Sequence, residues 1–378
     1  MDQPPTTTIS IFFGDLPDPR IERTKRHGLL DILTIAICAM ICGAEGATQI
    51  ALFGNAKETW FRTFLKLPHG IPSHDTFGNV LANLDPAAFE RCFMKWVRHW
   101  AQDLAGEVVP IDGKALRRSF DRAARKNPLH LVSAWASESG LSLGQVATAD
   151  KSNEITAIPQ LLTLLDIRGA SVTIDAMGCQ KAIAQQIVDQ KGDYVLAVKD
   201  NQPTLHEGVQ KLIAEVRSHP GPPRYDYQET TEKGHGRLEV RRVWCTEQVS
   251  WLRQREDWPD LHSVAMVESQ RTVGEQTSVE RRYYISSHQQ IKAQRLAHII
   301  RRHWAIENEL HWSLDVAFDE DRCRVRKGHG DRNLALLRKI ALNLLKQEKT
   351  AKVGIPSKRL KAGWDHTYLL RVLAVEGI

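Results

Sequence analysis

Two apolar runs in the middle of this chain each end in an aspartate, and this pattern restricts the folds that the chain can adopt. V-V-P-I-D ends at Asp112, and S-V-T-I-D ends at Asp175. Short runs rich in Val and Ile are typical of buried strands. A carboxylate at the tip of a buried strand is poorly solvated, so it is stable only if it is protonated, paired or bound to a cation.

The segments around these aspartates predict an α/β fold with a mixed sheet. Strands are expected from Val108 and over residues 129–136 and 141–148, with Gly140 in a hairpin turn between the last two. Helices and strands then alternate: helix 153–165, strand 171–175, helix 180–191, strand 194–199 and helix 203–216. In the strand order of the ribonuclease H fold, the first and fourth strands are neighbours. Asp112 and Asp175 are then expected side by side.

Changes in residue pattern divide the chain into five predicted parts. Residues 1–105 form a helical domain that is a candidate for DNA binding, with helices expected over 29–43, 55–67 and 86–104 and caps at Ser73 and Asp75. Residues 106–218 form the first part of the core, and residues 219–290 form a β-rich insertion. Residues 291–348 are helical and carry Glu307, and residues 349–378 form a basic tail.

Charge and cysteine usage favour a cytoplasmic protein with a nucleic-acid partner. The 378-residue chain has a net charge of +6, but residues 322–361 hold 13 Lys or Arg against two acids. Such a local excess favours a polyanion, although a solvated helix face is the alternative. The six cysteines have no zinc-ligand spacing. The start M-D-Q-P-P-T-T-T is unlike a signal peptide, and the apolar stretch 29–44 is too short to span a membrane.

Glu307 completes a set of three carboxylates. It is expected on one helix face with His311 and Asp315, at four-residue intervals. Three carboxylates without Cys or His partners suit Mg²⁺ or Mn²⁺, and two such ions can hold the attacking and leaving oxygens of a phosphodiester. The alternative for Asp112 is a turn, because Asp-Gly is a common turn dipeptide. For Glu307 the alternative is a solvated salt-bridge face.

Several motifs in order resemble the DDE transposases of bacterial insertion sequences, most closely the ISAs type with its H-repeat-associated proteins. The resemblance covers nearly the whole chain. It rests on D-P-R near Asp18, the F-G-x-x-K-x-x-W-like run at 53–60, G-I-P-S-H-D-T-F at 70–77, I-D-G-K at 111–114, D-A-M-G-C-Q at 175–180, V-K-D-N-Q at 198–202, G-H-G-R-x-E at 234–239 and H-W-x-I-E-N-x-L-H-W-x-L-D-V at 303–316.

The resemblance implies a ribonuclease H-like catalytic core and a metal-binding triad of Asp112, Asp175 and Glu307, with a β insertion before the glutamate. It also implies double-stranded DNA as partner, both transposon ends and target, and a dimer or larger assembly on DNA. The broader group has a Tyr-Arg-Glu-Lys signature around the glutamate. Here Ile300, His303 and Leu314 occupy the other three places.

Thirteen residues are candidate DNA contacts, because they carry positive or hydrogen-bonding groups near the predicted site or in the basic region. They are Lys114, Lys199, Asn201, Arg237, Arg301, Arg302, His311, Arg324, Arg326, Lys327, Lys358, Arg359 and Lys361. Two alternatives to an active transposase remain: a DNA-binding protein derived from a transposase, and a host nuclease. Inverted repeats flanking the gene would distinguish an active element from both.

Overall fold

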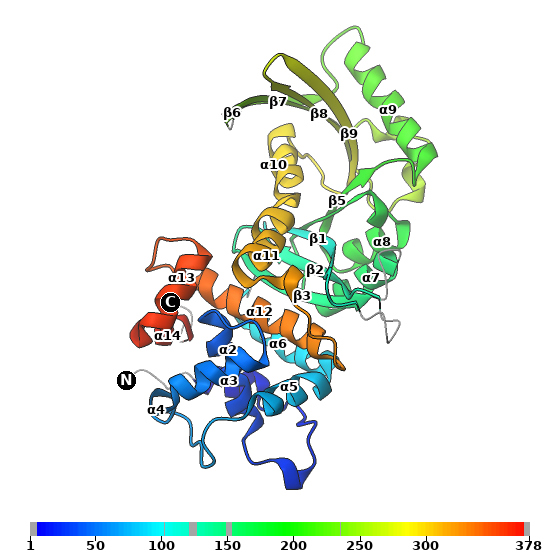
Figure 1. Ribbon diagram of the computed structural model, residues 1–378. Helices are drawn as coiled ribbons and strands as arrows, with labels where there is room; N and C mark the ends of the chain where they lie inside the picture. Colours follow the sequence, from blue (N-terminus) through cyan, green and yellow to red (C-terminus); the bar gives the residue numbers. More distant parts are fainter. Residues whose placement is uncertain (1–5, 102, 121–126, 149–152, 235, 374–378) are drawn as a thin grey trace.

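A single nine-stranded sheet runs through the molecule (Figure 1). The computed structural model describes residues 6–101, 103–120, 127–148, 153–234 and 236–373. The strand order is β3-β2-β1-β4-β5-β9-β8-β7-β6. The strands are β1 (Val108–Ala115), β2 (His130–Ala136), β3 (Leu141–Thr148), β4 (Ser171–Ile174), β5 (Asp193–Val198), β6 (Asp226–Gly234), β7 (Arg237–Thr246), β8 (Ser263–Val273) and β9 (Gln276–Ser286).

The predicted pairing of the two aspartate strands is confirmed. β1 and β4 are parallel neighbours, and Ile111 of β1 is the register partner of Ile174 of β4. The next residue on each strand is therefore an aspartate, at the same end of the sheet. β2 and β3 form the expected antiparallel hairpin, with Gly140 at φ 69°. The turn alternative for Asp112-Gly113 is wrong, because both residues lie inside β1 and pair with β2.

The helices lie around this sheet and below it (Figure 1). α7 packs on β2 and β3, whereas α10 packs on β1 and β4. The helices are α1 (Thr6–Phe13), α2 (Leu29–Ile41), α3 (Ala47–Ala56), α4 (Glu58–Phe61), α5 (His74–Asn83), α6 (Pro86–Trp100), α7 (Glu154–Leu164), α8 (Lys181–Asp189), α9 (Pro203–Ser218), α10 (Ala293–His303), α11 (Trp312–Phe318), α12 (Gly330–Gln347), α13 (Ile355–Trp364) and α14 (His366–Leu373). A π-helical turn, Ile306–His311, separates α10 from α11.

The N-terminal helices differ in detail from the prediction. α2 is confirmed and is buried almost all round, and Ser73 caps α5 by accepting a hydrogen bond from Thr76 N. The helix expected over 55–67 is misplaced, because α3 starts at Ala47 and α4 ends at Phe61. The apolar side chains of 55–67 gave a helical periodicity, but the helical turns that pack against α5 come earlier in the chain.

Strands β6–β9 extend the sheet that carries the aspartates. β9 pairs antiparallel with β5, and the β8, β7 and β6 strands follow in order. In Figure 1 these strands arch away from the helical region, with α9 along one side. The segment predicted as a β-rich insertion is therefore joined to the core by continuous strand pairing.

The C-terminal basic segment folds as two helices against the rest of the chain. α13 and α14 pack on each other and on α12. The Tyr368 hydroxyl donates to Glu348 Oε2 at 2.8 Å, and both side chains are buried. The segment is therefore part of the folded body and not an extended tail up to residue 373.

Among the described residues, no helix is long and apolar enough to cross a membrane. The expectation of no signal peptide concerns residues 1–8, of which the first five lie outside the described residues.

Burial on all sides of α2 makes its core positions sensitive to truncation. Ile37 is 1% exposed, whereas Leu52 on α3 is 65% exposed. We expect Ile37→Ala to lower the free energy of unfolding by about 2–5 kcal/mol, because it leaves a cavity in a packed core. The matched control Leu52→Ala is expected to change it by about 0.5 kcal/mol or less. Denaturant titration measures both, and equal effects would contradict the placement of α2.

Candidate active site

Asp112 and Asp175 lie next to each other where the parallel pairing of β1 with β4 ends, and β1 itself continues to Ala115. Asp175 Oδ1 accepts hydrogen bonds from the backbone N–H groups of Met177 at 3.0 Å and Gly178 at 3.3 Å. The carboxylate thus caps the short 3₁₀ turn Ala176–Gly178 that follows β4. Since the cap uses Oδ1 and the strand fixes the backbone, the orientation of this carboxylate is set by two independent constraints.

The loop after β5 supports the same turn. Asn201 Nδ2 donates to Ala176 O, and Gln202 Nε2 donates to Cys179 O at 3.0 Å. Lys199 precedes them and is exposed. The structure therefore brings Asn201 to the Asp175 turn, where its amide holds the protein backbone.

Glu307 sits on the π turn, in a series of side chains at four-residue intervals that face the sheet. His303 Nδ1 lies 3.0 Å from Thr173 Oγ1 of β4, and His311 Nδ1 lies 3.8 Å from Asp112 Oδ2 of β1. Asp315 forms an ion pair with Lys114 of β1. The expected alignment of positions 307, 311 and 315 is present, and the structure extends it to His303.

The π turn explains how this series stays aligned. An α-helix has 3.6 residues per turn, so side chains four residues apart drift by about 40° per step. Three steps would rotate Asp315 about 120° away from His303. A π turn is wider, because its hydrogen bonds span five residues. The prediction of a regular α-helix through Glu307 is wrong at this turn, and the wider turn compensates the drift.

The carboxylates are close enough to act on one another electrically. Burial, together with the charges of Glu307, Asp175 and Glu154, raises the pKa of Asp112 to about 7, although a backbone hydrogen bond at Gly113 acts in the opposite direction. Burial and nearby cations lower the pKa of His311 to about 3, so its imidazole is neutral near pH 7. The His311–Asp112 contact is therefore not an ion pair at that pH.

The donor set fits a hard divalent cation, although the coordination shell is not closed. In the described part of the chain, no three His, Cys, Asp or Glu side chains are close enough to hold a metal ion as placed. Carboxylate oxygens are the ligands that Mg²⁺ and Mn²⁺ prefer. The Nδ1 of His311 faces Asp112, whereas its buried Nε2 has no hydrogen-bond partner among the described residues. A neutral imidazole nitrogen without a proton can accept a hydrogen bond.

Lys114 is occupied by the protein. Its ammonium pairs with Asp315 and, at 3.0 Å, with Glu320 Oε2, and the Lys114 side chain is only 12% exposed. Burial alone would raise the pKa of Glu320, but the charges of Lys114, Lys339 and Arg338 outweigh it and hold the pKa below the usual value. Lys114 therefore holds the glutamate-bearing segment on β1 and is not available to a phosphate. Sequence reasoning missed this pairing, because Glu320 lies 206 residues away.

Two further candidate DNA contacts are buried and are corrected here. Lys358 donates to Leu345 O at 2.9 Å and also contacts the Glu348 backbone and side chain. Arg359 donates to Met40 O at 2.9 Å and to Ala317 O, and its guanidinium stacks on Phe318. Both cations hold helices together. Their partners lie on other helices or come far earlier in the chain, so local composition could not identify this role.

The remaining candidates lie at or near the surface in different places. Arg302 pairs with Glu309 at 2.9 Å, and Arg301 pairs with Glu232 at 2.9 Å. Arg237 is exposed where β6 and β7 meet, and Lys361 is exposed beside the Tyr368 ring. Arg324 and Lys327 are exposed, and Arg326 is half-buried.

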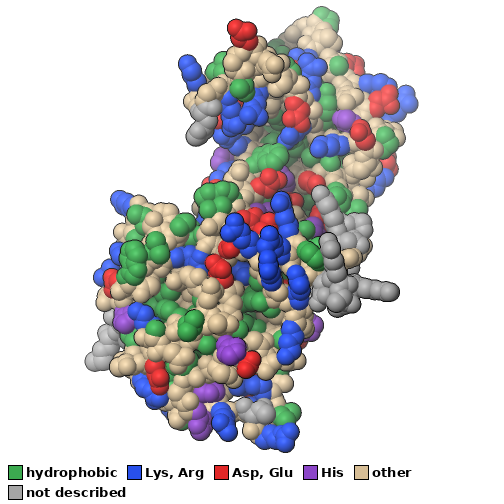
Figure 2. Space-filling view, in the orientation of Figure 1, with side chains coloured by type: hydrophobic (Ala, Val, Ile, Leu, Met, Phe, Trp, Pro, Cys, Tyr) green, Lys and Arg blue, Asp and Glu red, His purple; other side chains and the backbone are tan. Residues whose placement is uncertain are grey.

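A basic cluster forms where two distant segments meet beside the carboxylates. Arg117 Nε lies 3.2 Å from Asp321 Oδ2, and Arg326 lies 3.5 Å from Arg118 O, so the residues after β1 contact those after α11. Figure 2 shows Lys and Arg side chains gathered beside acidic ones in the middle of this face. The basic cluster consists of Arg117, Arg118, Arg322, Arg324, Arg326 and Lys327. The first three were not among the predicted contacts.

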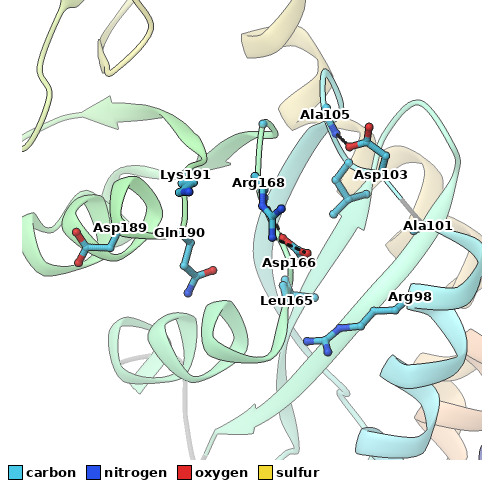
Figure 3. Close-up of a pocket in the computed structure, with 12 residues that line it drawn as sticks. Arg98, Ala101, Asp103, Ala105, Leu165, Asp166, Arg168, Asp189, Gln190 and Lys191 are labelled. Atoms are coloured by element: carbon cyan, nitrogen blue, oxygen red, sulfur yellow. Dashed lines mark hydrogen bonds and ion pairs between the residues drawn. The ribbon is translucent and has the colours of Figure 1, made fainter.

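A separate open cavity of about 1020 Å³ lies at the opposite end of the sheet (Figure 3). Its lining comes from the segments that precede β1, β4 and β5, and it includes both acids and bases. Arg98, Arg168 and Lys191 are exposed there. The balanced charge and the distance along the strands separate this cavity from the carboxylates.

Comparison with known proteins assigns the class. Residues 103–344 match the family described as Transposase DDE domain, and residues 11–97 match the family described as DDE_Tnp_1-associated. The chain therefore belongs to the DDE-domain transposases, which confirms the resemblance inferred from its motifs.

Two proteins of Escherichia coli are similar to this chain over 96% of its length. It is 42% identical over 368 residues to "Putative transposase YncI" of Escherichia coli O157:H7, covering 96% of this chain and 93% of that protein. It is 39% identical over 370 residues to "H repeat-associated putative transposase YhhI" of Escherichia coli strain K12, covering 96% and 97%. A solved piggyBac transposase synaptic complex with hairpin DNA aligns with 95% of this chain and 79% of that chain. Its TM-score of 0.44 and 12% identity are too low to carry an argument.

The raised pKa of Asp112 makes the stability of the metal-free protein depend on pH. In the unfolded chain this carboxyl ionises near 3.8, whereas in the folded chain it ionises near 7. Folding therefore loses stability as the pH rises through this range, by an amount on the order of a few kcal/mol above pH 7. Asp112→Asn removes the charge. We expect it to stabilise the metal-free protein at pH 8 and to have little effect below pH 4, as measured by denaturant titration in EDTA. An equal effect at both pH values would contradict the raised pKa.

Proposed function

We propose that this transposase cleaves and joins DNA strands with a divalent-metal site formed by Asp112, Asp175 and Glu307. The observation that carries the proposal is the placement of Asp112 and Asp175 directly after register partners of β1 and β4, where the charges of Glu307 and Asp175 both act on the half-buried Asp112. Carboxylates whose charges act on one another in this way are mutually repulsive, and a divalent cation would relieve that repulsion.

The arrangement of β1–β5 supports a ribonuclease H-like core for this site. The order β3-β2-β1-β4-β5, with β1 parallel to β4 and β4 parallel to β5, puts the two aspartates next to each other where the pairing of β1 with β4 ends. The glutamate lies on the π turn that packs on β1 and β2, directly after α10, which packs on β1 and β4.

The residues of this chain would hold and orient the reacting groups. Bound Mg²⁺ or Mn²⁺, expected as two ions, would lower the pKa of water and neutralise charge on the phosphodiester. Asp112 is acted on by the charges of both other carboxylates, so it would hold the metal together with Asp175 and Glu307. Neutral His311 can accept a hydrogen bond from water beside Asp112. A 3′-OH released at a transposon end would then attack target DNA at the same site, with no covalent protein–DNA intermediate.

Substrate and assembly follow from this chemistry. The substrate class is double-stranded DNA, both transposon ends and target. The basic cluster beside the carboxylates supports it, because exposed Arg and Lys side chains contact phosphates. Since two ends must be brought together before joining, we propose a dimer or larger assembly on DNA.

Strand cleavage is expected to require the metal and all three carboxylates. We expect Asp112→Asn, Asp175→Asn and Glu307→Gln each to abolish cleavage of DNA carrying the element's ends in Mg²⁺ or Mn²⁺, while DNA affinity stays within about three-fold, because phosphate contacts supply most of that affinity. Gel analysis of labelled strands measures cleavage. Full activity in EDTA would refute the metal requirement.

Glu309→Gln is the matched control for Glu307→Gln. The two glutamates lie two residues apart on the π turn, but Glu309 pairs with Arg302 and lies 3.7 Å from Lys346. We expect Glu309→Gln to retain at least about a tenth of the cleavage rate, a loss of about 1.4 kcal/mol or less in barrier height. If Glu309→Gln abolished cleavage and Glu307→Gln did not, the assignment of the third carboxylate would be wrong.

The basic cluster is expected to set the salt dependence of DNA binding. Each phosphate contact contributes about 0.9 to the slope of log K against log[salt]. Replacing Arg118, Arg324 and Lys327 with Gln should therefore flatten the slope by about 2–3 and weaken all DNA sequences alike. Fluorescence anisotropy over a range of salt concentrations measures the slope.

The matched control replaces three exposed cations at the opposite end of the sheet. Gln substitutions at Arg98, Arg168 and Lys191 remove the same charge from the cavity in Figure 3. We expect the slope to stay at the wild-type value. A similar flattening in both triple variants would mean that overall charge, and not the basic cluster, determines binding.

A further inference from the structure

Gly113 follows the first aspartate, and its lack of a side chain is explained by a buried contact between a glutamate and a histidine. A Cβ atom added at Gly113 would lie 2.2 Å from Glu154 Oε1 and 2.6 Å from His130 Nε2. Gly113 lies inside β1, paired with Val132, and its φ is not in the left-handed region. Space for these two side chains, and not backbone conformation, therefore requires glycine here.

Glu154 and His130 form this pair under the end of β1. His130 Nε2 lies 2.6 Å from Glu154 Oε1, and the two residues are 4% and 5% exposed. His130 begins β2 and Glu154 begins α7, so the pair joins a strand and a helix. Because side chains alternate along a strand, Gly113 faces this pair, whereas Asp112 and Lys114 face the glutamate-bearing segment.

A buried carboxylate beside the site has an electrical effect on it. The Glu154 charge acts on Asp112 together with those of Glu307 and Asp175. Burying a carboxylate that is held by a single imidazole is costly, and a hydrophobic side chain would fill the same space without that cost. The Glu154 carboxylate lies against Gly113, the residue next to Asp112, and its charge can therefore attract a cation to the site.

We propose that Glu154, held by His130, supplies a fourth negative charge to the site of Asp112, Asp175 and Glu307 and acts as a positioning residue for the divalent cation. The inference rests on the proposed function. Glu154 is not assigned as a ligand. It raises the negative potential at the ligands, and His130 fixes where that charge lies.

The test measures Mn²⁺ binding to the full chain without DNA. The electron paramagnetic resonance signal of free Mn²⁺ gives the amount that is not bound. Glu154→Gln keeps the shape and a hydrogen bond to His130 but removes the charge. We expect it to raise the Mn²⁺ dissociation constant by at least about five-fold, because the charge around a site tunes its cation affinity. The thermal midpoint of the metal-free variant checks that it is folded.

The matched control is Glu138→Gln, which removes a carboxylate that also pairs with a histidine, His298 at 3.0 Å, away from the site. Its Mn²⁺ affinity should stay within about two-fold of wild type. His130→Gln keeps the Glu154 charge but replaces the side chain that holds it, so its affinity should fall by less than that of Glu154→Gln. A loss in His130→Gln as large as that in Asp112→Asn would overturn the proposal, and this holds even if Glu154→Gln fails to fold.

Asp112→Asn distinguishes a failure of the Glu154 role from a failure of the metal site itself. If Asp112→Asn weakens Mn²⁺ binding but folded Glu154→Gln does not, the fourth charge is refuted and the three-carboxylate site stands. If wild type binds no Mn²⁺, or Asp112→Asn binds it as well as wild type, the proposed metal site fails, and the role of Glu154 fails with it.

Discussion

The buried ion pairs of Lys114 are the contact on which the geometry of the candidate site depends. Lys114 follows Asp112 by two residues on β1, so the strand that carries the first carboxylate also carries the cation that binds the glutamate segment. Asp315 and Glu320 supply the partners, and Glu320 is 1% exposed. Removing one member would leave an uncompensated buried charge, which typically costs about 3–5 kcal/mol. These ion pairs therefore fix the distance between β1 and the segment that follows Glu307.

The strand part of the fold could be predicted from the sequence because its signals are local. Short Val- and Ile-rich runs marked the strands, and Gly140 marked the hairpin, which it closes at a positive φ. The order of elements then restricted the pairing enough to place Asp112 beside Asp175. The prediction worked because a parallel strand pair needs a crossover, and the helices between the runs supplied it.

The parts that could not be predicted depend on partners far away in sequence. The sequence predicted Lys358 and Arg359 as exposed cations, because the density of Lys and Arg does not reveal which of them donate hydrogen bonds to backbone carbonyls. Arg359 reaches Met40 O, 319 residues away. Gly113 read as a possible turn, because its true neighbours, His130 and Glu154, come from two other elements. The π turn was missed because a four-residue repeat is compatible with an α-helix over two turns and diverges only over a longer stretch.

The three carboxylates differ in how rigidly they are held, and this difference is informative about the site. Asp112 and Asp175 are fixed by adjacent parallel strands, and Asp175 also by its cap on the following turn. Glu307 is exposed and lies on a π turn, where the helical hydrogen bonding departs from the regular pattern. His303 and Asp315 hold the segment on either side of it. Under the proposed function, closing the coordination shell requires a movement mainly of the Glu307 side chain, whose flanking contacts can stay in place while it turns toward the two fixed aspartates.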